Sequence, residues 1–259
     1  MATDKRRWDE ARWYTIDGVT YPSVTTILRI IDKSGPLMGW AVNQERAVFK
    51  AAIEDALSDP SLTGTQAVLD AVMKKTADRA YKSKMTEAAN IGLAAHAWIH
   101  WRTMKMLGQT DEPEPTIPSA SETAVLSWMD WAREVEYVPQ CAERRVWCPA
   151  CGFAGTLDVV AKVRGVLTLA DWKTGKGVYP EAYLQNLAYR HAAAREGIVT
   201  EAGLIVRLPK VESDPAFEAV PVPTMPFGYF ISAIRLWTWQ RIMDGLPHGP
   251  AMTKCAVTL

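Results

Sequence analysis

Two apolar runs of β-type composition flank the dipeptide Arg164-Gly165, and they constrain this chain more than any other feature. Residues 156–163 and 166–172 are rich in Val, Leu and Ala, and a tight turn between them favours an antiparallel hairpin. Counting outwards from the turn places Asp158 directly opposite Asp171, and a four-residue loop gives the same register. We therefore expect both carboxylates on one face of the sheet, with Cβ atoms about 4.5–5.5 Å apart.

A positive group is expected between these two acids, because like charges that face each other across strands repel. Side chains alternate along a strand, so Lys173 shares the face of Asp171, while Trp172 points away and offers its backbone carbonyl nearby. Carboxylates and carbonyls are the ligands that a hard cation such as Mg²⁺ or Mn²⁺ prefers. The alternative is a surface ion pair between Lys173 and Asp171. The apolar composition of both strands favours the metal centre, because charges in such a sheet must be paired or coordinated.

The rest of the chain predicts an α/β fold with a mixed central β-sheet flanked by helices. Residues 12–22 alternate around Asp17-Gly18 and predict a second, short hairpin. We expect a single domain over residues 1–259, with a mainly helical elaboration over 1–135 and the sheet core over 136–259. Helices are expected at about 24–31, 36–57, 66–106 with breaks, 119–135, 180–196 and 227–243, and further strands at about 142–147, 202–208 and 216–222.

Charge and hydropathy exclude several classes of protein. The 29 Lys and Arg residues balance the 29 Asp and Glu residues, so bulk attraction to nucleic acid is excluded, although a local basic groove is not. No apolar run reaches the roughly 18 residues of a membrane span, and the first residues lack the apolar stretch of a signal peptide. We therefore expect a cytoplasmic protein that has no membrane partner.

Four cysteines are too few for a disulfide framework in a chain of this length. Cys148-Pro-Ala-Cys151-Gly is a CxxC motif at an expected turn, a pattern that can bind Zn²⁺ or an iron–sulfur cluster. Cys141 lies near it in the sequence, and Cys255 can return from the C-terminal end to complete four thiolates. The alternative is a turn that carries two reduced thiols.

Three motifs in order, Gly155-x-x-Asp158, Asp171-Trp-Lys173 and Gln185-x-x-x-Tyr189, resemble the PD-(D/E)XK nuclease superfamily. The resemblance is to its RecB-like branch, which includes many phage exonucleases. Gly92-x-x-x-His96 matches a histidine on an upstream helix of that branch, and residues 21–28, followed by Trp40, match its N-terminal segment. Together the matches span about residues 20–190. Asp158 stands in a Gly-x-x-Asp context rather than a literal Pro-Asp, which is usual in this branch.

The resemblance implies a role for each matched residue. The catalytic residues would be Asp158, Asp171 and Lys173. The metal ligands would be His96, Asp158, Asp171, the Trp172 carbonyl and, on the preceding strand, Glu143. The DNA contacts would be Gln185, Tyr189 and Lys176. For His96 the alternative is a satisfied core histidine, and for Tyr189 it is a buried phenol that is hydrogen-bonded to Gln185.

The function that the resemblance implies is a Mg²⁺- or Mn²⁺-dependent DNA exonuclease that hydrolyses phosphodiester bonds. It would serve recombination or repair in a bacterium or a phage-infected host, with DNA and a recombination or single-strand-binding protein as partners. A structure-specific or restriction-type endonuclease and an inactive DNA-binding protein remain alternatives. The iron–sulfur cluster of some relatives is not carried over, because they place one cysteine ahead of the nuclease motifs and here none precedes Cys141.

Overall fold

The computed structural model describes residues 12–32, 34–76, 79–214 and 216–252. The strands are β1 (Trp13–Ile16), β2 (Val19–Pro22), β3 (Val138–Cys148), β4 (Phe153–Val163), β5 (Val166–Thr174), β6 (Ala202–Leu208) and β7 (Glu218–Pro221). The helices are α1 (Val24–Ile27), the 3₁₀ helix η2 (Leu28–Ile30), α2 (Ser34–Ser58), α3 (Thr65–Lys75), α4 (Ala80–Met106), α5 (Ser119–Glu134), α6 (Pro180–Arg195) and α7 (Gly228–Met243). The expected elements are present, with boundaries that differ by a few residues. Within the described ranges, every helix is too short or too polar to cross a bilayer.

The described residues form two compact units rather than the single domain expected from the sequence. One unit holds the residues up to Ile31 and from Gly92 onward, and the other runs from Asp32 to Ile91. The division therefore falls inside helix α4, not at residue 135. The smaller unit has its own apolar cluster, in which Ala52 and Val72 join α2 to α3. α2 and α3 pack on each other, so the smaller unit is compact even though its second boundary falls within a continuous helix.

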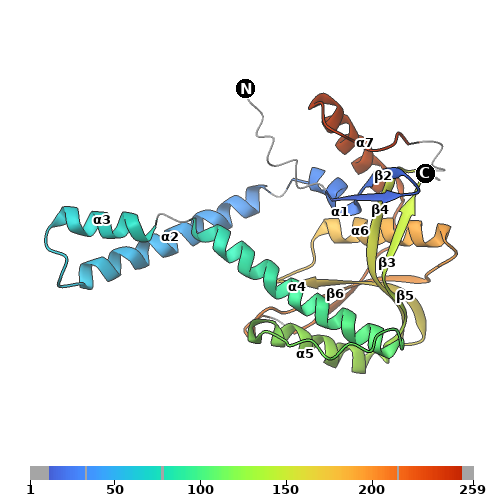
Figure 1. Ribbon diagram of the computed structural model, residues 1–259, viewed down its shortest axis with the longest axis horizontal. Coiled ribbons are helices and arrows are strands. Elements are labelled where there is room, and N and C mark those ends of the chain that lie inside the picture. Colours follow the sequence, from blue (N-terminus) through green and yellow to red (C-terminus); the bar gives the residue numbers. More distant parts are fainter. Residues whose placement is uncertain (1–11, 33, 77–78, 215, 253–259) are drawn as a thin grey trace. The chain divides into compact units, whose positions relative to one another are not determined.

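A five-stranded mixed sheet forms the centre of the larger unit, with strand order β3-β4-β5-β6-β7 (Figure 1). Only β5 and β6 pair in parallel, and the other neighbours are antiparallel. A parallel pair needs a crossover connection, and α6 supplies it. The buried amide of Asn186 fixes this helix on the sheet by donating to the carbonyls of Leu169 and Leu204 at 3.0 and 3.3 Å.

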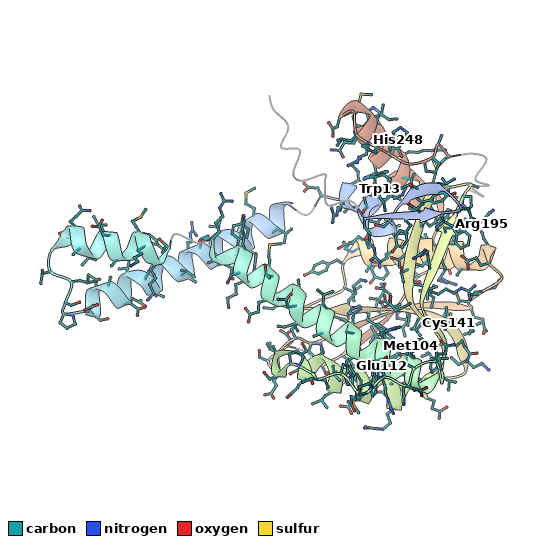
Figure 2. All side chains as sticks on the ribbon, viewed as in Figure 1. Trp13, Met104, Glu112, Cys141, Arg195 and His248 are labelled. Carbon is teal, nitrogen blue, oxygen red and sulfur yellow. The ribbon has the colours of Figure 1, made fainter. Side chains whose placement is uncertain are left out.

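Helices cover both faces of this sheet. One face packs against α1, α6 and α7 through buried side chains that include Leu157, Leu169 and Phe230. The other packs against α5 and the second half of α4 through Trp98, Trp128, Trp131 and Trp172. Figure 2 shows Met104, near the end of α4, and Glu112, in the loop that follows, beside α5. The sheet is therefore a buried layer, and a charged residue within it needs a specific partner.

Two tight turns confirm the hairpins that were expected from sequence. Arg164 and Gly165 have φ values of 49° and 82°, and Asp17 and Gly18 have 50° and 76°. Positive φ at both central residues is the signature of a type I′ turn. The β4–β5 ladder runs from Val163–Val166 back to Val159–Ala170, which is the predicted register.

Candidate active site

Three acidic residues lie level with one another on the neighbouring strands β3, β4 and β5. The β4–β5 ladder ends at Val159–Ala170, one residue before Asp158 and Asp171. On the other side, Glu143 falls between the paired positions Ala142–Val159 and Arg144–Leu157, so it stands level with Asp158. Glu143 also has a left-handed φ of 46°, which is uncommon inside a strand.

Asp171 is the most buried of these acids, with no exposed surface. Its Oδ1 accepts a hydrogen bond of 3.0 Å from Nε2 of Gln185, and its Oδ2 forms an ion pair with Lys173. Oδ2 is buried, and the Lys173 ammonium is its partner among the described residues. Burial raises the pKa of Asp171 to about 6, with the Lys173 charge opposing this rise and the Asp158 charge adding to it. The site thus holds negative charge that its own residues only partly neutralise.

Asp158 uses one carboxylate oxygen to hold the backbone of the next strand. Its Oδ2 accepts a hydrogen bond of 2.7 Å from the N–H of Trp172. The indole of Trp172 points away from the acids, as expected, and packs with Trp128 and Trp131 at ring centroid distances of 6.1 and 5.3 Å. The aromatic cluster therefore anchors β5 at the residue between Asp171 and Lys173.

Lys173 lies beside Asp171, as the strand alternation predicted, and its side chain keeps 33% of its surface exposed. Burial lowers the pKa of Lys173, but the charges of Asp171 and Asp158 outweigh that effect, so the pKa is raised overall. The side chain is therefore an ammonium ion that stands at the border between the buried acid and solvent.

Gln185 and Tyr189 lie on one face of α6, and both belong to the hydrogen-bond network around Asp171. Nε2 of Gln185 donates to Asp171 and lies 3.4 Å from the Tyr189 hydroxyl. Tyr189 is only 4% exposed. Burial, and then the charges of Asp171 and Asp158, raise the pKa of Tyr189 well above its usual value, so the phenol is neutral. The structure thus has the buried tyrosine beside Gln185 of the alternative interpretation, and its contact with DNA stays a prediction.

Tyr189→Phe is expected to leave DNA binding and cleavage within about threefold of wild type, because a 3.4 Å hydrogen bond is long and contributes little. Gln185→Ala is expected to lower cleavage more strongly, because it leaves Asp171 without its only described amide donor. Fluorescence anisotropy with a labelled oligonucleotide and a cleavage assay measure the two effects. A large loss of DNA affinity in Tyr189→Phe, with unchanged cleavage of bound DNA, would instead support a direct contact between Tyr189 and DNA.

Helix α4 approaches the end of β5 closely, and His96 of this helix lies on the side of the acids. A Cβ added at Gly92 would lie 2.7 Å from Oγ1 of Thr174, so only glycine lets the helix lie this near the end of β5. His96 follows one turn later, and its charge lowers the pKa of Asp171. Burial raises the pKa of Glu143, and His96 and Arg12 oppose that rise, although the Glu143 side chain is exposed. His96 thus faces two of the three acids.

Lys176 stands apart from this buried network. It is exposed in the segment that joins β5 to α6, three residues beyond Lys173. Its side chain is exposed to solvent, and the contact with a phosphate backbone stays a prediction.

The cysteines group differently from the expected set of four. Cys148 and Cys151 lie together with His191 of α6, and Cys141 is not part of this group. Cys255 lies outside the described residues. Sequence reasoning missed His191, because nothing in a single sequence shows which turn of α6 meets the β3–β4 connection. The available signal was the Cys-Pro-x-Cys-Gly turn itself, which needs further ligands from elsewhere in the chain.

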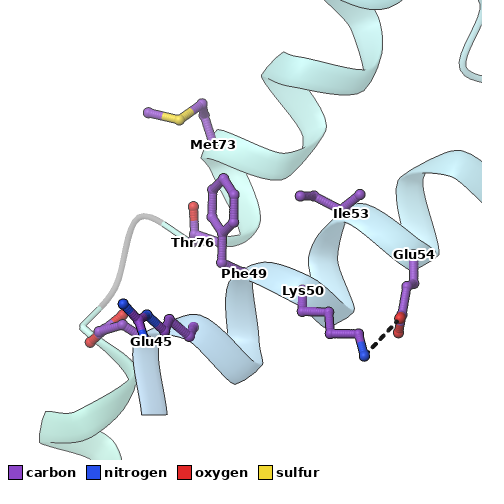
Figure 3. A pocket seen from close by; sticks show the side chains of 8 residues that line it. Glu45, Phe49, Lys50, Ile53, Glu54, Met73 and Thr76 are labelled. Carbon is purple, nitrogen blue, oxygen red and sulfur yellow. Dashed lines mark ion pairs between the residues drawn. The ribbon is translucent and has the colours of Figure 1, made fainter. Parts of the chain in front are cut away.

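A separate pocket lies between α2 and α3 in the smaller unit (Figure 3). Its lining combines the apolar side chains of Phe49, Ile53 and Met73 with an ion pair of 3.7 Å between Lys50 and Glu54. No residue that the sequence assigned to the active site or to DNA lines this pocket.

Comparison with known proteins adds little to this picture. No protein-family model matches the chain, and no curated protein matches it. Among solved structures, the chain is similar to one titled "Crystal structure of SSO0001", with a TM-score of 0.29 and 13% identity. That match covers 48% of this chain and 61% of the other, so it spans about three-fifths of the solved protein. The chemistry of the site therefore has to follow from its own residues.

Proposed function

We propose that this protein is a metal-dependent deoxyribonuclease whose active site is formed by Asp158, Asp171 and Lys173. The main support is the environment of Asp171, a fully buried carboxylate that lies beside a second acid and shares the Lys173 ammonium with it. A buried charge of this kind must be paired or coordinated. The order of the motifs, which resembles RecB-like nucleases, adds DNA as the substrate.

The donor atoms at this site fit a hard divalent cation. Asp158, Asp171 and His96 would hold Mg²⁺ or Mn²⁺, with Glu143 at the exposed side and the Trp172 carbonyl as a further oxygen. Oδ2 of Asp171 is buried and pairs with Lys173, and a cation would offset the negative charge that this ammonium leaves at the two acids. When bound, the cation would supply a Lewis acid that acidifies water and offsets charge on the scissile phosphate.

Residues of the protein itself would orient the Asp171 carboxylate and offset negative charge on the phosphate. Gln185 fixes the rotation of the Asp171 carboxylate through its 3.0 Å hydrogen bond, so that Oδ2 stays turned toward Lys173. The Lys173 ammonium is placed to stabilise negative charge that develops on a phosphate oxygen. Its raised pKa favours this role over that of a general base. Lys176 would hold the DNA backbone from the solvent side.

The resemblance favours an exonuclease over an endonuclease. A comparison of linear and circular DNA as substrates tests this preference. End-labelled linear DNA and covalently closed circular DNA, each single- and double-stranded, are incubated with Mg²⁺, Mn²⁺ or EDTA. We expect metal-dependent loss of linear DNA only. Cutting of circles would establish the endonuclease instead, and retention of DNA without cleavage under every metal would establish a binding protein.

Divalent cations are expected to raise the melting temperature of the wild-type protein and not that of Asp171→Asn. Burial raises the pKa of Asp171 from 3.8 to about 6, so in the metal-free protein its contribution to stability is full below pH 3.8 and is lost as the pH rises through about 6. A cation binds the ionised form, so the melting-temperature shift should grow between pH 5 and pH 8. Thermal denaturation with Mn²⁺ and with EDTA across this range measures the shift. An equal shift in Asp171→Asn would place the cation elsewhere.

A further inference from the structure

Cys148, Cys151 and His191 bring three metal-binding atoms together at a place that none of the nuclease motifs uses. Nε2 of His191 lies 3.8 Å from Sγ of Cys148 and 3.9 Å from Sγ of Cys151. All three atoms lie within 4.8 Å of one another. Around a tetrahedral Zn²⁺ with bonds of about 2.3 Å to sulfur and 2.0–2.1 Å to nitrogen, two sulfurs lie about 3.8 Å apart and sulfur and nitrogen about 3.6 Å. The observed separations are close to those of ligands around one ion.

The turn that carries both cysteines has the geometry of a metal-binding loop. The carbonyl of Cys148 accepts hydrogen bonds from the N–H groups of Cys151 and Gly152 at 3.1 and 2.8 Å, which closes the turn between β3 and β4. Gly152 has a φ of 74°, a conformation that favours glycine. Burial raises the pKa of the Cys148 thiol, and hydrogen bonds from the N–H groups of Cys151 and Ala150 oppose this rise. Both cysteines are fully buried.

His191 is held in position to complete this group. Its ring stacks on Phe227 with centroids 3.8 Å apart and planes 7° from parallel. This stacking leaves Nε2 directed at the two sulfurs. The three side chains come from the β3–β4 turn and from α6, so an ion here would join a hairpin to the helix packed on it.

The described part of the C-terminal segment passes close to this turn. A Cβ added at Gly152 would lie 2.9 Å from the carbonyl oxygen of Pro250. Cys255 follows Pro250 by five residues and lies outside the described residues.

We propose that, in the reduced protein, Cys148, Cys151 and His191 bind a structural Zn²⁺. Thiolates and an imidazole in tetrahedral arrangement are the ligands of structural zinc. In the structure Cys151 is disulfide-bonded. A phosphine reductant supplies the two electrons that, with two protons, convert the disulfide to two thiols, and zinc binding then releases the protons of the coordinating thiols. This set replaces Cys141 of the sequence-based expectation by His191.

The zinc content of the purified chain tests this proposal. The protein is produced in zinc-supplemented medium, purified without chelators under a phosphine reductant, and measured by mass spectrometry of the metal. We expect about one zinc ion per chain in the wild type, and background levels in Cys148→Ser and His191→Ala. Cys141→Ser, on the same strand as Cys148, is the matched control and should keep its zinc, as should Asp171→Asn.

Cobalt substitution covers the case in which a variant fails to fold. Co²⁺ added to the metal-free wild type should give intense d–d absorption of a tetrahedral site together with thiolate charge-transfer bands. Wild-type protein without zinc and without these bands would overturn the proposal, and so would full zinc content in Cys148→Ser. The visible absorption of an iron–sulfur cluster would replace zinc as the occupant. Because the nuclease assay does not enter, failure here leaves the proposed function intact.

Discussion

Asp171→Asn and Lys173→Ala are each expected to lower the rate of metal-dependent DNA degradation by about 10³-fold. Asp171 is the buried acid that would bind the cation, and the Lys173 ammonium pairs with its Oδ2. Replacing either removes charge at the place where the phosphate would react. The initial rate of nucleotide release from labelled linear DNA, at saturating Mg²⁺, measures the loss.

Two matched variants show whether this loss is local. Lys162→Ala removes an exposed lysine of β4, and Asp130→Asn removes an acid on α5 that is 65% exposed. Both should keep wild-type rates. Circular dichroism must show that Asp171→Asn and Lys173→Ala remain folded. Wild-type activity in either would mean that these two residues form only a structural ion pair, as the simpler interpretation of the sequence has it.

Gly155→Ala is expected to destabilise the protein by about 2 kcal/mol and to lower its cleavage rate about tenfold or more. A Cβ at this position would lie 2.4 Å from Cε1 of Tyr189, and that ring is buried and cannot swing aside. Moving the ring moves Gln185, which shares its helical face and holds Asp171. Urea denaturation and the cleavage assay measure the two effects.

The control for this substitution is Gly177→Ala, because a Cβ there meets no atom within 4 Å. The double variant Gly155→Ala with Tyr189→Ala tests the mechanism directly. With the ring absent, the added methyl meets no collision, so the double variant should cost less than the sum of the two single changes. Additive losses would show that Gly155 matters for another reason.

Local patterns in the sequence were sufficient to predict the β4–β5 hairpin. The turn at Arg164-Gly165 and the alternation of side chains fix the β4–β5 register, and that register alone brings Asp158 near Asp171 and puts Lys173 on the same face. Gln185 and Tyr189 share a helix face by simple spacing. In each case the residues that lie together are close in the sequence, and their positions follow from the spacing of residues along a strand or a helix.

The misses all depend on contacts between distant segments. The burial of Tyr189 follows from the absence of a side chain at Gly155, and the position of His191 follows from how α6 packs on the β3–β4 turn. The boundary between the two units was missed because it falls within the continuous helix α4, where no Gly- or Pro-rich segment marks it. Local periodicity in the sequence does not indicate how distant segments pack on one another.

The order of strands across the sheet also governs the order in which the site can assemble. Strands β3, β4 and β5 are successive antiparallel neighbours, so contacts among Glu143, Asp158 and Asp171 require only short loops to close. The parallel β5–β6 pairing requires the chain to complete α6 first, and contacts between distant segments form slowly. The three acids therefore meet early during folding, before Gln185 is fixed on the sheet. We therefore expect the mutual repulsion of these acids to slow the folding of the sheet as well as to act in the finished site.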